Sequence, residues 1–188
     1  MFAPFDAVAL NDEPSTIYAL TEALRISYVN RAWSRFAQAN GATWKDGEWG
    51  IGAPVMDAIP AVLQPFYERL FNTALKQREV VEHDYECPSA TEFRQFRMRI
   101  LPCASGLLVV HSLLRSELIA PEAPVMESLY RRHDGLVLQC SHCRRVRRAD
   151  LPQWDWVPSH VERPTVPTSH GLCMICSDYY YPRSKAEP

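Results

Sequence analysis

The sequence predicts an α+β protein in two parts, a domain of ordinary size followed by a small module that carries four cysteines. Three observations indicate this: up to residue 115 two strand-like segments, then helix-like segments and then three more strand-like segments follow one another, a proline-containing segment comes next, and two Cys-x-x-Cys pairs lie in the last third. The 188 residues suffice for one full-sized core and a small second module. We expect an N-terminal extension over 1–14, the first domain over 15–115, a linker over 116–135, the cysteine module over 136–182 and a tail over 183–188.

The composition is that of an ordinary globular protein. Hydrophobic residues make up 47% and charged residues 22%, which argues against wholesale disorder and against a membrane protein. No uninterrupted apolar run approaches the roughly 18 residues that a membrane span needs. The first residues contain neither a basic leader nor a small-residue cleavage pattern, so we expect no signal peptide. A cytoplasmic location follows as the expectation, and there paired cysteines hold metal more often than disulfides.

Charge separates the two parts of the chain. Residues 1–129 carry a formal balance of −5, whereas residues 130–188 carry +3. The C-terminal part therefore differs from the rest of the chain in the sign of its net charge.

The first domain begins with two strands and a helix. Residues 17–20 and 26–29 have the composition of short strands joined by a turn. Asn30 can cap a helix by accepting a hydrogen bond from a first-turn N–H, and Gly41 offers the left-handed conformation that ends helices. We predict a helix between these two residues.

A longer helix follows after a loop rich in Gly and Trp. Residues 54–59 can form a helical turn, and residues 60–77 repeat their apolar side chains at helical spacing. Pro65 favours the first turn of a helix, so the regular helix can begin there instead of at Pro60.

Three strands complete the first domain. In 80–86 and 94–101 charged residues alternate with apolar ones, and an antiparallel pairing would set carboxylates opposite guanidinium groups. Residues 107–114 are nearly all apolar, which is typical of a central strand covered on both faces.

This order, together with residues 28–33 (YVNRAW) and the segment 50–60, resembles a PAS domain over about residues 15–115. The resemblance implies a five-stranded antiparallel sheet, flanked by helices, around a cavity that senses a small molecule, light, redox state or a partner. Haem-binding relatives often place a His on the long helix, but 60–77 contains none. The Asn-Cys-Arg sequence of flavin-binding relatives is also missing. Neither haem nor flavin is implied.

Several side chains are candidates for lining such a cavity. His83 and His111 lie on predicted strands and could reach the sheet face, although a hydrogen-bonded structural role is the favoured interpretation. Trp44 and Trp49 could close over a bound molecule, or pack back on the core. The full candidate set is His83, Tyr85, Met98, His111, Trp44 and Trp49.

The cysteine module predicts a closed metal site. Cys140 with Cys143, and Cys173 with Cys176, form two Cys-x-x-Cys pairs with 29 residues between them. A two-residue spacer lets both sulfurs of a pair face one ion at about 2.3 Å. Four thiolates complete a tetrahedral shell, so we expect a structural site, and zinc as its ion.

Alternatives to zinc differ in strength. Disulfides are typical of secreted proteins, and we expect no signal peptide here. A thioredoxin-like redox pair requires a βαβ unit, which the sequence does not predict. Covalent haem attachment requires a His directly after the second cysteine, but Arg144 occupies that position. An iron–sulfur cluster stays open as the weaker alternative. His142 and His170 are candidate substitute ligands, and for His170 we favour an outer role, steadying the second pair.

Residues 140–147 (CSHCRRVR) and 169–176 (SHGLCMIC) resemble a cysteine-rich tail appended to some bacterial PAS and receiver proteins. The resemblance covers about residues 136–182. It implies a bacterial signalling context and no particular reaction.

We therefore expect a cytoplasmic PAS-type sensory protein that binds a small ligand or a signalling protein and can form a homodimer through its first domain. We expect no enzyme, since a four-thiolate site leaves no position for substrate water. The alternative is a zinc-dependent nucleic-acid-binding or thiol-redox-sensing regulator. The run Arg144, Arg145, Arg147 and Arg148 could contact phosphates, but a solvated basic face is the favoured interpretation.

Overall fold

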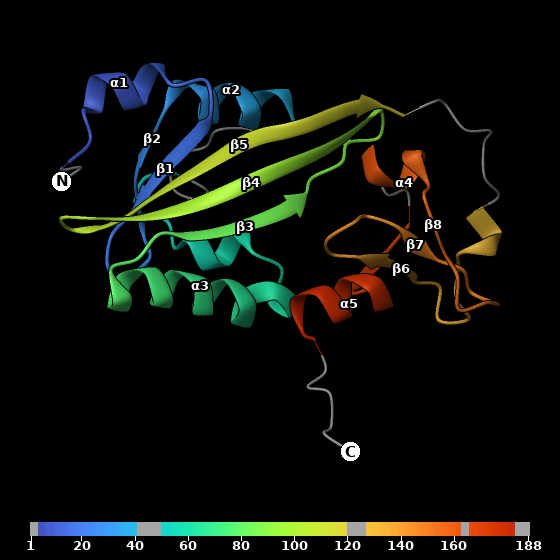
Figure 1. Ribbon diagram of the computed structural model, residues 1–188. Helices are drawn as coiled ribbons and strands as arrows, with labels where there is room; N and C mark the ends of the chain where they lie inside the picture. The colour runs from blue at the N-terminus through green and yellow to red at the C-terminus, as the bar shows by residue number, and fades with distance from the viewer. Residues whose placement is uncertain (1–3, 41–49, 120–126, 163–165, 183–188) are drawn as a thin grey trace. The chain divides into compact units, whose positions relative to one another are not determined.

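The computed structural model describes residues 4–40, 50–119, 127–162 and 166–182 (Figure 1). The chain divides into two compact units. The first comprises residues 1–85 and 96–114, and the second comprises residues 86–95 and 115–188. The second unit therefore includes the connection between two strands of the first sheet as well as the cysteine-bearing part.

Five strands form the sheet of the first unit in the order β2-β1-β5-β4-β3. Their bounds are β1 Thr16–Leu20, β2 Ile26–Val29, β3 Val81–Glu86, β4 Glu92–Cys103 and β5 Gly106–Leu118. β1 pairs antiparallel with β2 and with β5, setting Tyr18 opposite Val109. The predicted α+β class with a five-stranded antiparallel sheet is confirmed.

The fifth strand differs from its prediction at its far end. It runs to Leu118, so residues 116–118, expected as linker, are strand. Backbone pairing explains the extension, because the N–H of Ile119 still reaches the carbonyl of Thr91 over 2.9 Å. Only the first part of the strand is covered on both faces, since Leu113 and Leu114 are about half exposed.

Two short helices of the first unit contact each other. α1 (Ala7–Asp12) falls in the segment predicted as an extension, and the Asp6 side chain caps it by accepting from the N–H of Val8. In α2 (Arg31–Ala39) the predicted cap is confirmed, because Oδ1 of Asn30 accepts from the N–H of Trp33 over 2.9 Å. The same oxygen accepts from the N–H of Ile17, so one buried amide ties β1 to the helix. Gly41 lies outside the described residues.

The long helix covers the face of the sheet that carries Met98 and Ile100. Two short 3₁₀ turns, η1 (Val55–Ala58) and η2 (Ala61–Leu63), lead into α3 (Gln64–Gln77). The regular helix thus begins next to Pro65, as the sequence predicts. It ends at Arg78, which adopts the left-handed conformation with φ 58°.

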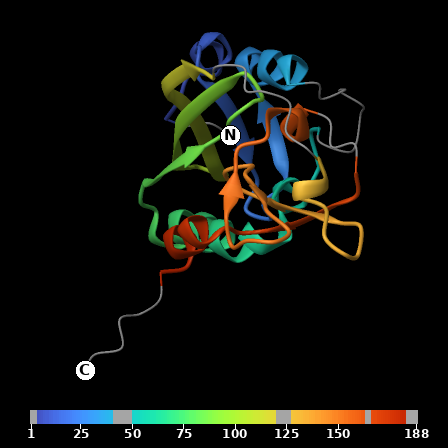
Figure 2. The same cartoon turned by 90° about the vertical axis from the view of Figure 1, so that its right-hand side faces the viewer.

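Apolar side chains cover both faces of the sheet. Figure 2 shows the ribbon from a second direction, with α1 in dark blue and α3 in green. The face toward α3 holds the larger cluster: Leu20, Ile26, Val55, Phe71, Ala74, Met98, Ile100, Leu107 and Val109. On the other face Ile17, Ala19 and Leu108 pack against Phe5 and Leu10 beside α1. The alternation of β5 between the two clusters follows from the two-residue period of a strand.

A charged pair lies on the outer positions of β3 and β4. The guanidinium of Arg97 donates to both carboxylate oxygens of Asp84, over 2.7 and 2.9 Å. The pairing of carboxylates with guanidinium groups predicted for these strands is therefore present. This hydrogen-bonded contact lowers the pKa of Asp84.

A second sheet forms the centre of the second unit, in the order β8-β7-β6-β9. Its strands are β6 Val137–Cys140, β7 Val146–Arg147, β8 Trp154–Asp155 and β9 Thr168–Gly171, and its helices are η3 Glu127–Leu129, α4 Pro158–Glu162 and α5 Met174–Tyr180. β6 and β9 run parallel. A small core of Tyr130, Val137, Val146, Val157 and Val166 packs against this sheet.

Within the described residues, no helix combines the length and the apolar character that crossing a membrane requires.

Candidate metal centre

The first cysteine pair lies where β6 turns back into β7. The N–H of Cys140 donates to the carbonyl of Arg145 over 2.8 Å, and this closes a tight turn that contains Cys143. Arg144 takes the left-handed conformation with φ 63°, which reverses the chain. Both sulfur-bearing side chains are buried on the inside of the turn.

The second pair begins α5. Cys173 caps the helix, its sulfur accepting from the N–H of Cys176 in the first turn over 3.5 Å. This spacing sets the two side chains at one end of the helix, beside its free N–H groups. Cys173 is therefore both a helix cap and a candidate ligand.

Parallel pairing of β6 with β9 brings the two pairs together. Cys140 lies opposite Gly171, and the N–H of Ser141 donates to the carbonyl of Gly171 over 2.7 Å. Cys173 follows only two residues later. A connection of 29 residues in sequence thus ends beside its starting point.

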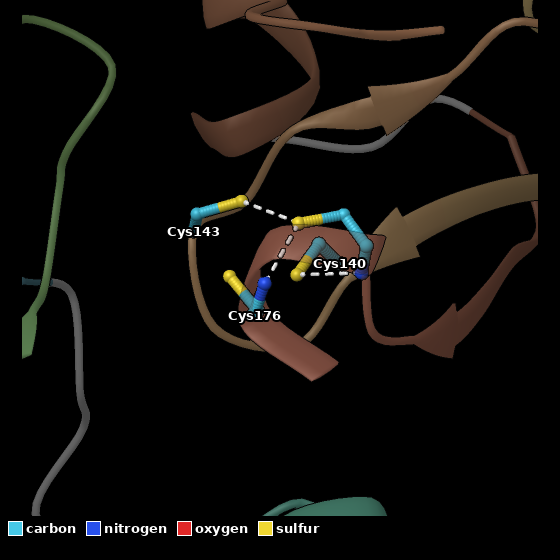
Figure 3. Close-up of side chains that lie close together, drawn as sticks. Cys140, Cys143 and Cys176 are labelled. Atoms are coloured by element: carbon cyan, nitrogen blue, oxygen red, sulfur yellow. Dashed lines mark hydrogen bonds between the residues drawn. The ribbon is translucent and has the colours of Figure 1, made fainter. Parts of the chain in front are cut away.

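All four sulfur atoms lie within 4.8 Å of one another, and all four cysteines are buried and free of disulfides (Figure 3). The sulfurs of Cys143 and Cys173 are 3.8 Å apart. Four sulfurs bound tetrahedrally at about 2.3 Å from one ion would be about 3.8 Å apart. The cluster therefore has the dimensions of a four-coordinate site for a single ion.

The pKa values of Cys140, Cys143 and Cys176 indicate that a cation is needed if all four cysteines are to ionise. Hydrogen bonds from the Cys143 and Cys176 side chains lower the pKa of Cys140, with help from the N–H of Cys173 3.4 Å away. The contact with Cys140 raises the pKa values of Cys143 and Cys176, because a neighbouring thiolate opposes further loss of protons. Only a bound cation would let all four sulfurs be thiolates together.

His142 stands directly outside this cluster. Its Nδ1 lies 3.3 Å from the sulfur of Cys176, and its Nε2 accepts a hydrogen bond from the N–H of Glu86 over 3.1 Å. The ring of Tyr180 meets it edge to face, with the centroids 5.0 Å apart. With Nε2 accepting, Nδ1 carries the proton and points it at the sulfur, the arrangement that orients metal-binding side chains.

Two other side chains near the cysteines differ in position. Arg145 places a positive charge near Cys143. His170, which the sequence predicts to steady the second pair, is exposed on β9 opposite Gln139. The histidine that lies beside the cysteine sulfurs is therefore His142 and not His170.

The predicted cavity residues fall on the sheet face toward α3. Met98 is buried in the core cluster, and the ring of His83 is buried against Phe66, with the centroids 4.8 Å apart. The hydroxyl of Tyr85 lies 2.7 Å from Nδ1 of His111. Trp44 and Trp49 lie outside the described residues.

Tyr18 joins this group, although sequence reasoning did not single it out. Its ring stacks on His111 with centroids 5.5 Å apart, because β1 pairs with β5. Burial lowers the pKa of His111 to about 4, and the neutral ring then can accept from Tyr85. Aromatic residues at alternating positions of neighbouring strands were the available signal.

The arginine run after the first cysteine pair does not form one basic face. Arg145 lies near Cys143, whereas Arg148 pairs with Asp150 over 3.4 Å. Arg147 points to a small pocket on the sheet, which Arg148 also lines.

A comparison with protein-family models finds no match, and a comparison with curated proteins finds none that is significant. Among solved structures, the chain is similar to a PAS domain from Colwellia psychrerythraea, at 12% identity and a TM-score of 0.44 over 57% of this chain and 92% of that one. The PAS domain of BvgS from Bordetella pertussis shows 17% identity and a TM-score of 0.42 over 56% and 79%. A domain of an HTR-like protein from Haloarcula marismortui shows 16% and 0.40 over 55% and 100%.

Proposed function

We propose that this chain is a sensory signal-transduction protein of the PAS type, whose C-terminal module is held together by one structural zinc ion. The observation that carries the metal assignment is the meeting of four buried cysteine sulfurs within 4.8 Å. The five-stranded antiparallel sheet with helices on both faces supports the sensory assignment, since it has the architecture that the PAS resemblance implies.

Zinc fits the four sulfurs better than the alternatives. A d¹⁰ ion accepts tetrahedral thiolate ligands without a further requirement, and four of them leave no open position for substrate. An iron–sulfur cluster distributes its cysteines over different iron atoms, so some of their sulfurs would lie farther apart than the 4.8 Å within which all four lie here. The proposed site is therefore structural, and its binding energy contributes to the folding of a small core.

The proposed sensory surface is the sheet face that carries His83, Tyr85 and His111. Aromatic rings and imidazoles offer stacking area together with a few hydrogen-bonding groups, the usual composition of a small-molecule site. The response would pass to a signalling protein or to a second copy of the chain. Thiolate ligation also requires reduced cysteines, so the proposal places the protein in a reducing compartment such as the cytoplasm.

Native mass spectrometry of the purified full-length chain tests both parts of the proposal. One zinc per chain is expected, and any retained small molecule and the number of subunits appear in the same spectrum. Unfolding the protein before the measurement should release both metal and ligand. A chain that carries no metal under reducing conditions, or that carries iron with inorganic sulfide, would contradict the zinc assignment.

Redox sensing is the second candidate, and the close approach of the same sulfurs favours it. If mild peroxide ejects the metal and a reductant restores it, the thiolates respond to oxidant. Retention of the ion at peroxide levels that oxidise an exposed thiol would leave the site purely structural.

A further inference from the structure

A small pocket of about 220 Å³ lies in the second unit, on the surface of the β6–β7 pair. Its lining residues are Arg132, His133, Leu138, Arg147, Arg148 and Ala149. Three of these six carry a guanidinium group, and the cysteines are not among them. The pocket is thus separate from the metal centre within the same unit.

The side chains reach this pocket through the alternation of the strands. Val137 and Val146 point into the core, so Leu138 and Arg147 point to the other face of the sheet. The turn before β6 supplies the remaining wall, and it is fixed by the hydrogen bond from the N–H of Arg132 to the carbonyl of Leu136 over 2.9 Å.

The three guanidinium groups around the pocket differ in whether a carboxylate pairs with them. Arg132 pairs with Asp134 over 3.0 Å and Arg148 with Asp150 over 3.4 Å, so carboxylates hold these two guanidinium groups in place. Among the described residues, no ion pair involves Arg147, and its side chain is exposed at the pocket. Two fixed guanidinium groups and one uncompensated charge therefore surround the same small space.

We propose that this pocket binds a small tetrahedral oxyanion of the phosphate class. Guanidinium groups offer paired N–H donors whose spacing matches two oxygens of a phosphate. A volume of about 220 Å³ lies below the usual range for drug-sized ligands, so the pocket suits a phosphate or a phosphate monoester better than a nucleobase. Arg147 is the principal anchor, because its charge is not shared with a carboxylate.

The test is a titration of the zinc-loaded, ¹⁵N-labelled full chain with inorganic phosphate, in which sodium chloride keeps the ionic strength constant. We expect saturable amide shifts at residues 132–133 and 147–149. Arg147→Gln should weaken the affinity about tenfold, the loss expected for one charge-assisted hydrogen bond. Arg144→Gln removes the same charge from the same run but lies outside the pocket, so it should leave the affinity unchanged.

Three outcomes would overturn the proposal. The first is a wild type that shows no saturable shifts with phosphate. The second is an equal loss of affinity in both variants, which would indicate an effect of charge alone. If a single-stranded oligonucleotide binds more tightly than phosphate and loses affinity equally in both variants, the arginine run is a nucleic-acid surface. Zinc content measured on each variant separates loss of the pocket from loss of the module's fold.

Discussion

The backbone N–H of Glu86 donates a hydrogen bond to Nε2 of His142 over 3.1 Å, at the point where β3 ends. This contact fixes which imidazole nitrogen carries the proton, and so directs Nδ1 toward the sulfur of Cys176 at 3.3 Å. A strand end and a candidate metal ligand are therefore joined through one ring. Within the second unit, a displacement of residue 86 would move the ring of His142 and so change its contact with Cys176.

Replacing this ring should weaken the metal site without removing a ligand. We expect His142→Phe to lower zinc affinity by about 10–100-fold, the usual effect of losing a residue that orients a ligand. Competition with a chromogenic chelator measures the change. His170→Phe is the matched control, because His170 is exposed on β9 and should leave the affinity unaltered. Equal effects of the two substitutions would contradict the role given to His142.

Gly106 should tolerate a side chain less well than the other first-unit glycine whose surroundings are described, Gly52. Its φ of +132° is unfavourable for any side chain, and a Cβ there would lie 2.0 Å from the carbonyl oxygen of Leu20. Gly106→Ala should therefore destabilise the unit by about 3 kcal/mol or more. Urea unfolding of the purified variant gives this value.

Gly52 provides the comparison for that experiment. Its φ is +93°, but no atom lies within 4 Å of the position a Cβ would take. Gly52→Ala should cost only the backbone strain, about 1–2 kcal/mol. If Gly106→Ala and Gly52→Ala lower the free energy of unfolding equally, the close approach of Leu20 does not contribute to the destabilisation.

His111 should make the first unit less stable as the pH falls. Burial lowers its pKa in the folded state to about 4, whereas the unfolded chain has an ordinary value near 6.5. The unfolded state therefore binds more protons between these values. The stabilising contribution is complete above about pH 6.5 and is lost as the pH falls toward 4.

Comparison with His111→Phe isolates this contribution, because the ring is kept and the titration removed. Between pH 7.5 and pH 5 the wild type should lose about 1–2 kcal/mol more stability than the variant, a figure reduced for the partial exposure of the ring. An NMR titration of the ring should show its pKa near 4. A His111 pKa at or above the ordinary value would refute the buried, neutral ring.

Local signals account for most of what the sequence predicts about the first unit. Asn30 caps α2 because its side chain needs only the next turn, and Pro65 marks the start of α3 for the same reason. The extension of β5 to Leu118 escaped prediction, because strand length there depends on pairing with a distant segment. α1 was missed as well, since six residues carry too little periodicity.

At the metal centre too, local sequence signals predict one part of the site and long-range contacts determine the other. Spacing alone identifies the four cysteines, because a two-residue gap is a local property. The choice between His142 and His170 depends on the parallel pairing of β6 with β9 and on the place of Glu86, neither of which spacing encodes. Long-range contacts decide the outer environment of the site.

X-ray absorption at the zinc edge of the full-length protein, purified under reducing conditions, tests the central claim most directly. The four-cysteine site predicts one zinc per chain with four sulfur neighbours at about 2.3 Å and no nitrogen or oxygen in the first shell. A first shell that contains nitrogen or oxygen, or a protein without zinc whose four cysteines are paired as disulfides, would contradict it.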